Sequence, residues 1–362
     1  MPLSKISSAG TTGFGRRNLI INGAMTVAQR GTSSSSFNFQ TVDRFRFADS
    51  ATDELAITQA QVADAPDGFV NSYKITVDTA ETSMTGNELL YMRYTNEAQD
   101  CQHLEYGSSS AKTLTLSFWV KSSITGDYAV LNFVEDSGRA RTLTYTINSA
   151  NTWEYKTIVF TGDTTTGKTI NNDNDKGLDF YFTLACGPDR ITTDAATAWV
   201  DYDTTAFAYG QTANVAGTTN ATWQVTGVQL EVGTVATDFE HRSYGEELAL
   251  CQRYYYQWLN ATTSDGHGLH VIGMYQGTRG FWGLSPPVAM RASPSITKVG
   301  TVTLRTPSLS GNGTVNSWSV YTYDKESNRL SIDTAVTGGT ANVYRNITFS
   351  NLTGGYKLEA EL

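Results

Sequence analysis

The sequence has 362 residues, of which 40% are hydrophobic and 17% are charged, and its formal net charge is -9. This length allows two or three domains that each bury a core, and the negative charge argues against a nucleic-acid-binding surface, because phosphate recognition needs clustered Lys and Arg. The 32 Gly and 19 Tyr residues, together with many Ser and Thr, are typical of β-sandwich proteins with polar turns.

The first residues, 1–17, are rich in Ser, Gly and Thr and cannot bury enough surface to fold alone, which predicts an N-terminal tail. This tail is either disordered or a peg that becomes ordered on another protein. No apolar segment approaches the roughly 20 residues of a membrane span, so we expect neither export nor membrane insertion, and synthesis in the cytoplasm.

Residues 18–240 contain runs in which apolar and polar residues alternate, as in strands with one buried face. Turn sequences separate the runs, so we expect roughly ten antiparallel strands packed as two sheets, a jelly-roll sandwich. In 113–122, one face carries Leu114, Leu116, Phe118 and Val120, and the other carries Thr113, Thr115 and Ser117. The predicted strands cover 54–61, 69–78, 88–95, 113–122, 127–136, 141–147, 153–161, 178–185 and 222–230.

A long segment of small and polar residues, 187–221, precedes the last of these strands. It contains four scattered aromatic residues, Trp199, Tyr202, Phe207 and Tyr209. Loops of this length usually bind something or pack on a neighbour. Either these side chains cover an open edge of the sandwich, or they contact another subunit.

A connecting helix is predicted over 241–260. Ser243 and Glu246 have the spacing of a capping box, which places the start of the helix near Ser243. An apolar stripe at steps of four and three follows, formed by Tyr244, Leu248, Cys251, Tyr255 and Trp258. The stripe either packs on one of the protein's own sandwiches or forms an oligomer seam, although two heptads are too short to hold three chains together on their own.

Residues 261–362 predict a second, smaller β-sandwich, with strands over 269–275, 279–285, 296–304, 317–324, 329–335, 342–349 and 356–362. This region is dense in aromatic residues, on which sugars can lay their apolar faces. The candidates for glycan binding are Tyr275, Trp282, Trp318, Tyr321 and Tyr323. Trp318 differs in parity from the two tyrosines that follow it, so at least one of these sets should point outward or lie at an interface.

Three acidic residues, Asp173, Asp175 and Asp179, form a candidate calcium site, because calcium prefers oxygen ligands. The glycine falls one position late for a helical calcium loop, and the same residues also suit an ordinary polar turn. No other cofactor is expected. The sequence shows no arrangement of nucleophile, base and orienting group, so we expect a protein without enzymatic activity.

Two long motifs resemble a known family. RRNLIINGAMTVAQRGTS covers 16–33 and is followed by Asp-Arg-Phe at 43–45, and GVQLEVGTVATDFEHRSYGEELALCQRYYYQ covers 227–257. Both resemble bacteriophage tail-fibre and virion-appendage proteins, which combine a jelly-roll like that of a carbohydrate-binding module with a C-terminal β-sandwich. Further similarity lies in 114–122, 286–296 and 356–362, so the resemblance covers most of the chain.

The resemblance implies a protein of the virion, usually a homotrimer, that attaches to other virion proteins through its N-terminal tail. It also implies binding of host surface glycans during adsorption, and it carries no catalytic residues. One alternative is a head decoration or adaptor protein that binds only other virion proteins. Another is a glycan-degrading tailspike, because the paired carboxylates of a glycosidase cannot be recognised from sequence spacing across strands.

Overall fold

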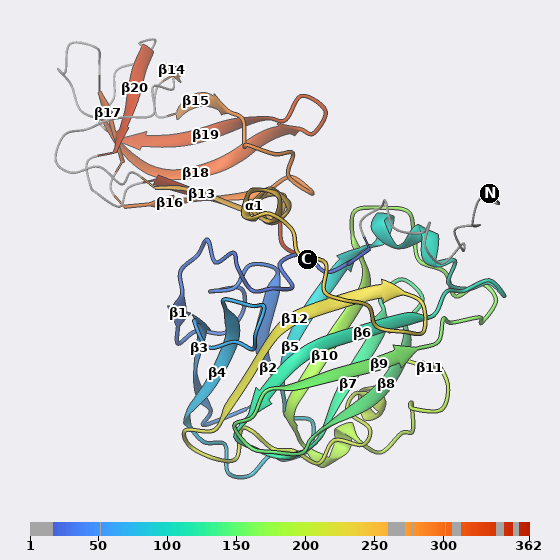
Figure 1. Cartoon of the computed structure of the whole chain (residues 1–362). Helices are drawn as coiled ribbons and strands as arrows, with labels where there is room; N and C mark the ends of the chain where they lie inside the picture. The colour runs from blue at the N-terminus through green and yellow to red at the C-terminus, as the bar shows by residue number, and fades with distance from the viewer. Residues whose placement is uncertain are drawn as a thin grey trace, which may run out of the picture. The chain divides into compact units, whose positions relative to one another are not determined.

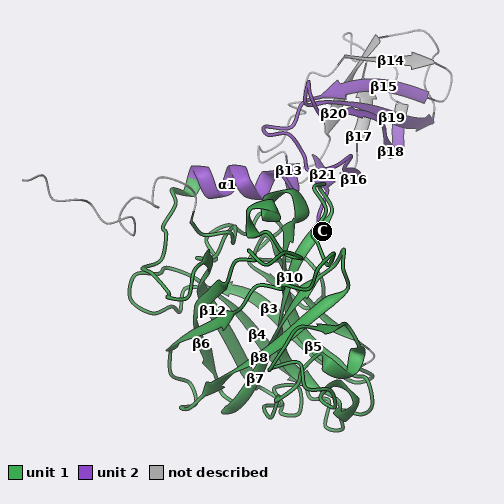
Figure 2. Ribbon diagram, turned by 90° about the vertical axis from the view of Figure 1, so that its right-hand side faces the viewer, with its two compact units in different colours: residues 1–244 green, residues 245–362 purple. Residues whose placement is uncertain are grey.

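The computed structural model describes residues 17–50, 52–259, 272–276, 279–300, 302–305, 313–337, 344–349 and 355–362. The predicted N-terminal tail lies outside these residues except for Arg17. The chain divides into two units, residues 1–244 and 245–362 (Figure 1 and Figure 2). Antiparallel strands build both units, so the all-β class predicted from the sequence is confirmed. No helix in the described part of the chain is long and apolar enough to cross a membrane.

Unit 1 is a sandwich of two six-stranded antiparallel sheets (Figure 1). In spatial order, the first sheet consists of β1 (Ser33–Ser34), β3 (Ala56–Val62), β4 (Ser72–Thr79), β12 (Thr222–Val232), β6 (Leu114–Ser122) and β9 (Glu154–Phe160). The second sheet consists of β11 (Val200–Asp201), β8 (Arg139–Ile147), β7 (Gly126–Val134), β10 (Lys176–Cys186), β5 (Leu89–Glu97) and β2 (Phe45–Ser50). The predicted jelly-roll sandwich is confirmed, and β1, β2 and β11 are strands that the sequence patterns did not predict.

Strand β6 shows how alternation builds the core of unit 1. Its buried face carries Leu114, Leu116, Phe118 and Val120, all fully buried in the main hydrophobic cluster. Burial of each such side chain contributes roughly 1.5–3 kcal/mol. Trp119 has the opposite parity, so it points to the outer face of the first sheet and is half-buried.

The segment 187–221 covers the outer face of the second sheet. Phe207 packs on Tyr91 and Tyr181, with ring centroids 6.1 and 5.1 Å apart. The indole N–H of Trp199 donates a hydrogen bond to the carbonyl oxygen of Thr161 at 2.8 Å. These contacts support the interpretation in which the aromatic residues of this segment cover the sandwich.

The N-terminal strap, residues 17–30, lies along β12 and joins the two motifs on which the family resemblance rests. The Leu19 amide donates to the carbonyl oxygen of Leu230, and the Val228 amide donates to that of Gly23, both at 2.9 Å. The side chain of Asn18 accepts from the Leu230 amide at 3.0 Å and donates to the Val228 carbonyl at 3.2 Å. The two motifs, which are some 200 residues apart in the sequence, are therefore one structural element.

The rest of the first motif stabilises the same end of the sandwich. Asn22, which has a left-handed backbone with φ 62°, donates from its side chain to the carbonyl oxygens of Val27 and Asp43, both at 2.9 Å. The carboxylate of Asp43 accepts from the Gln29 amide at 3.0 Å. Arg44 is buried and donates to the Thr95 carbonyl at 2.7 Å. These residues of the first motif therefore stabilise the fold at this end of the sandwich.

Glu240 makes the attachment of the strap sensitive to acid. Burial alone would raise its pKa, but hydrogen bonds from the amides of Asn18 and Arg17, together with the Arg242 guanidinium, hold the pKa below the ordinary 4.5. The contribution of ionised Glu240 to the stability of the folded state is therefore fully present above pH 4.5. It is lost as the pH falls through the lower pKa that Glu240 has in the folded protein. We expect Glu240→Gln to lower the urea unfolding midpoint at pH 7. The midpoint of this variant should also fall less than that of the wild type when the pH is lowered.

The same measurement on Glu326→Gln provides the control, because Glu326 is an exposed glutamate in a turn of unit 2. Equal midpoints for Glu240→Gln and the wild type at pH 7 would contradict the role of Glu240 in holding the strap.

The connecting helix is shorter than predicted. Helix α1 (Tyr244–Gln252) starts next to Ser243, as the capping box indicates, but it ends eight residues before the predicted end at 260. The following residues form β13 (Tyr255–Leu259), which pairs with β21 (Gly355–Glu359). The prediction was wrong here because consecutive aromatic residues favour a strand when a partner strand is available, and tertiary pairing overrides a helical period.

This shorter helix removes the predicted oligomer seam. Tyr244 is 61% exposed and Leu248 is half-buried, whereas Cys251 is buried. Tyr255 and Trp258 lie in β13, where Tyr255 is fully buried and Trp258 stacks on Tyr356 at 6.0 Å. The five residues therefore do not form one helical stripe, and the prediction of a heptad seam was wrong.

The described part of unit 2 contains two sheets. A three-stranded sheet consists of β13, β21 and β16 (Ser295–Val299). The other strands are hydrogen-bonded in a closed ring, in the order β14 (Ile272–Gln276), β15 (Arg279–Leu284), β19 (Arg329–Thr337), β18 (Gly313–Asp324), β17 (Val302–Arg305) and β20 (Tyr344–Phe349). Buried side chains of both sheets form one core, so unit 2 is a small sandwich whose larger sheet closes into a barrel.

Candidate functional site

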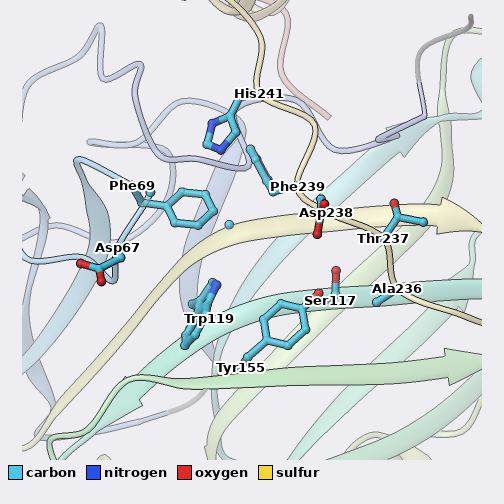
Figure 3. Close-up of a pocket in the computed structure, with 12 residues that line it drawn as sticks. Asp67, Phe69, Ser117, Trp119, Tyr155, Ala236, Thr237, Asp238, Phe239 and His241 are labelled. Carbon is cyan, nitrogen blue, oxygen red and sulfur yellow. The ribbon is translucent and has the colours of Figure 1, made fainter. Parts of the chain in front are cut away.

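A pocket of about 490 Å³ lies on the outer face of the first sheet of unit 1, and we call it the aromatic pocket (Figure 3). Its floor comes from β6, β9 and β12, and its walls come from the loop between β3 and β4 and from the segment after β12. The residues that line it are Asp67, Gly68, Phe69, Ser117, Trp119, Tyr155, Gly227, Ala236, Thr237, Asp238, Phe239 and His241.

Trp119 and Tyr155 form a platform on the floor of the pocket. They are direct partners in the pairing of β6 with β9, so their side chains stand side by side on the same face. The ring centroids are 5.3 Å apart, and the rings are tilted by 52°. Tyr155 remains 45% exposed, so the platform is open to a ligand.

Phe69, Phe239 and His241 form an aromatic cluster on the opposite side of the pocket (Figure 3). Phe69 lies 5.0 Å from Phe239 and 5.4 Å from His241, and the latter two are 4.9 Å apart, measured between ring centroids. Gly227 makes room for this cluster, because a Cβ atom there would lie 2.7 Å from the ring of Phe69. Its φ of +63°, at an irregularity in β12, also favours glycine.

Buried polar side chains of β12 hold the wall that carries the cluster. The carboxylate of Glu231 accepts from the Thr237 amide at 2.9 Å and from its hydroxyl at 2.7 Å. The side-chain oxygen of Gln229 accepts from the Glu240 amide at 2.8 Å. Arg17 forms an ion pair with Glu231 at 3.5 Å. The wall is therefore fixed before a ligand arrives, which lowers the entropy cost of binding.

Asp67 and Asp238 are exposed acidic residues in the lining of the pocket (Figure 3). Neither forms an ion pair with a cation among the described residues. Carboxylates accept hydrogen bonds from hydroxyl and N–H groups, and aromatic faces pack on C–H groups. This combination suits a ligand with flat apolar faces and polar edges, such as a sugar.

Two of the predicted glycan-binding residues lie in the core of unit 2. Trp282 and Trp318 are only 5% and 8% exposed, and their rings pack together at 5.2 Å. Trp282 also packs on Tyr356 of the three-stranded sheet at 6.3 Å. Their assignment as glycan-binding residues was wrong, because the core of this small sandwich takes up the large rings.

The three tyrosines among the predicted glycan-binding residues differ from one another in their surroundings. Tyr321 is 64% exposed, in agreement with the parity argument, and packs edge-on against Phe281 at 5.4 Å. The pairing of β18 with β19 shifts at Tyr321, which turns Tyr323 inward, where it packs on the core and its hydroxyl donates to the Met290 carbonyl at 3.1 Å. The side chain of Tyr275 lies outside the described part of the chain.

The predicted calcium ligands do not converge. Asp173 accepts from the backbone amide of Asp175 at 2.9 Å, as in an ordinary polar turn. Asp179 is fully buried in β10, where it accepts from the Tyr181 hydroxyl at 3.0 Å and faces the Arg93 guanidinium at 3.7 Å. No group of three or more potential ligands occurs among the residues that the structure describes. The calcium prediction was wrong because strand alternation places Asp179 against Arg93.

The aromatic pocket could not be predicted from the sequence patterns. Trp119 gave one usable signal, because it shares its parity with Thr115 and Ser117 and is therefore a large aromatic residue on an otherwise polar face. Phe69 and Phe239 gave no such signal. The contact between these two rings depends on how the segment after β12 folds over the sheet. No pattern of neighbouring residues in the sequence predicts that fold.

No family model and no curated protein matches the chain. Among solved structures, the enzymatically active domain of tailspike protein 4 of bacteriophage CBA120 aligns with 60% of this chain at 13% identity and a TM-score of 0.34, and the chain covers 21% of that protein. The family 11 carbohydrate-binding module of a cellulosomal cellulase of Clostridium thermocellum aligns with 57% of this chain at 12% identity and a TM-score of 0.28. The alignment covers 97% of that module. A putative sugar-binding protein of Bacteroides thetaiotaomicron aligns with 60% of this chain at 12% identity and a TM-score of 0.32. The alignment covers 100% of that protein. Likenesses at this level assign neither a family nor a ligand to the chain.

Proposed function

We propose that the chain is a bacteriophage tail-fibre or virion-appendage protein that binds host surface glycans during adsorption, and that the aromatic pocket is its glycan site. The observation that carries the proposal is the exposed Trp119–Tyr155 platform inside a pocket edged by carboxylates. Sugars pack their C–H faces on aromatic rings while polar groups take their hydroxyls. The two motifs of the family resemblance support the virion role.

The proposal includes a homotrimer without catalytic activity, located on the virion and attached through the N-terminal tail to other virion proteins. Single glycan contacts are weak, and several copies on one particle raise the overall avidity without new contacts. Light scattering of the purified protein tests this part, because a monomer would contradict it.

Removal of either ring of the platform is expected to weaken adhesion strongly. The test is a titration of host cells with labelled full-length protein, carried out with the wild type and with the variants Trp119→Ala and Tyr155→Ala. Each substitution should weaken binding at least about tenfold, because aromatic anchors at the centre of a site commonly contribute 2 kcal/mol or more. The same variants should fail to compete with the phage for adsorption.

Tyr321→Ala is the matched control, because it removes an exposed ring outside the pocket. If Tyr321→Ala abolishes binding and the pocket variants do not, the glycan site lies in unit 2. Wild-type protein that neither binds cells nor competes with the phage contradicts adhesion and favours the decoration or adaptor role. Release of soluble sugar from the cell polysaccharide contradicts the absence of catalysis.

A further inference from the structure

The aromatic pocket has two apolar surfaces, and a single sugar ring uses only one of them. The platform of Trp119 and Tyr155 lies on one side, and the aromatic cluster of Phe69, Phe239 and His241 lies on the other (Figure 3). A plain hexose stacked on the platform presents mainly hydroxyl groups to its surroundings, and an aromatic cluster satisfies hydroxyl groups poorly. The cluster therefore indicates a ligand with an additional apolar group.

The charges of the pocket narrow the choice of ligand. The Asp67 and Asp238 carboxylates form no ion pair among the described residues, and the Arg17 guanidinium donates to the backbone carbonyl of Asp238 at 2.7 Å. Ionised carboxylates accept hydrogen bonds but donate none, so they suit a ligand with N–H or O–H donors. They repel a sugar that carries its own carboxylate.

We propose that the pocket selects saccharides with an acetamido substituent, that is, N-acetylated amino sugars, and this inference rests on the glycan-binding function proposed above. The sugar ring stacks on the platform, and the acetamido methyl group packs against the aromatic cluster. The acetamido N–H donates to the Asp238 carboxylate. One uncharged substituent thus matches both the apolar cluster and the carboxylate, which neither a plain hexose nor a uronic acid does.

Calorimetric titration of the full-length protein with three trisaccharides of one backbone tests the proposal. The probes are triacetylchitotriose, cellotriose and the deacetylated glucosamine trimer. We expect triacetylchitotriose to bind at least about tenfold more tightly than cellotriose, since an added apolar group in a fitting pocket discriminates by this order. The glucosamine trimer, titrated at a pH at which its amines are uncharged, keeps the nitrogen and lacks the acetyl group, so it should also bind more weakly than triacetylchitotriose. Equal or tighter binding of the glucosamine trimer would overturn the role of the aromatic cluster.

Substitutions in the two apolar surfaces should act differently. Phe239→Ala should weaken the binding of triacetylchitotriose much more than that of cellotriose, so that the two affinities approach each other, whereas Trp119→Ala should weaken both. If Phe239→Ala does not fold, Phe239→Leu, which keeps an apolar side chain without the ring, should reduce the preference. A preference that survives the loss of the Phe239 ring overturns the proposal.

The outcomes for selectivity and for glycan binding are distinguishable. Equal affinities for the acetylated and plain trimers, both lost in Trp119→Ala, would overturn acetamido selectivity and support a glycan site in the pocket. If neither trimer binds, acetamido selectivity is overturned, and the titration onto host cells decides the glycan-binding function separately.

Discussion

Asp179→Ala is expected to destabilise unit 1 by about 3–5 kcal/mol, because it removes the carboxylate that faces the buried Arg93 guanidinium. Arg93 is 6% exposed, and its guanidinium lies 3.7 Å from the Asp179 carboxylate. The Tyr181 hydroxyl also loses its acceptor. Urea unfolding followed by tryptophan fluorescence measures the loss as a lower midpoint.

The double variant Asp179→Leu with Arg93→Met provides the control. It removes both charges and keeps apolar volume, so it should recover most of the stability that the single substitution loses. Calcium or a chelator should leave the wild-type midpoint unchanged, because Asp179 pairs with Arg93. A midpoint that rises with added calcium would contradict the ion-pair interpretation, and so would a single variant as stable as the wild type.

Gly23→Ala is expected to cost about 3 kcal/mol or more, through overpacking of two backbones. A Cβ atom at this position would lie 2.1 Å from the carbonyl oxygen of Val228. The strap cannot retreat from β12 without breaking the hydrogen bonds from Val228 to Gly23 and from Leu19 to Leu230. Urea unfolding of unit 1, followed by circular dichroism, measures the effect.

Gly245→Ala is the matched glycine control. Gly245 lies in the first turn of α1 with open space around it. Alanine has the higher helix propensity, by about 1 kcal/mol, so this variant should be as stable as the wild type or slightly more stable. Wild-type stability of Gly23→Ala would show that the strap does not need the close approach at this residue.

The strands could be predicted from the sequence because alternation acts over a few neighbouring residues. The run through Leu114, Leu116 and Phe118 specifies both a strand and its buried face. The end of the helix could not be predicted in this way. Tyr255 and Trp258 fit a helical stripe equally well, and only the distant strand β21 decides that they form a strand.

The candidate site was less predictable than the fold. A single shift in the pairing of β18 places Tyr321 outside and Tyr323 inside, although the sequence gives them the same parity. In the aromatic pocket, Phe69 and Phe239 are distant in sequence and meet because Gly227, which has no Cβ atom, leaves space for the Phe69 ring. Such contacts depend on tertiary structure, so composition and spacing do not report them.

The strap also has a mechanical consequence. The backbone amides of Arg17 and Asn18, the first described residues of unit 1, donate hydrogen bonds to the carboxylate of Glu240, close to the end of the unit. The chain therefore enters and leaves the sandwich at neighbouring points. Tension between the N-terminal end and unit 2 would load the hydrogen bonds between the strap and the segment after β12, and the strands of the sandwich would carry little of the force.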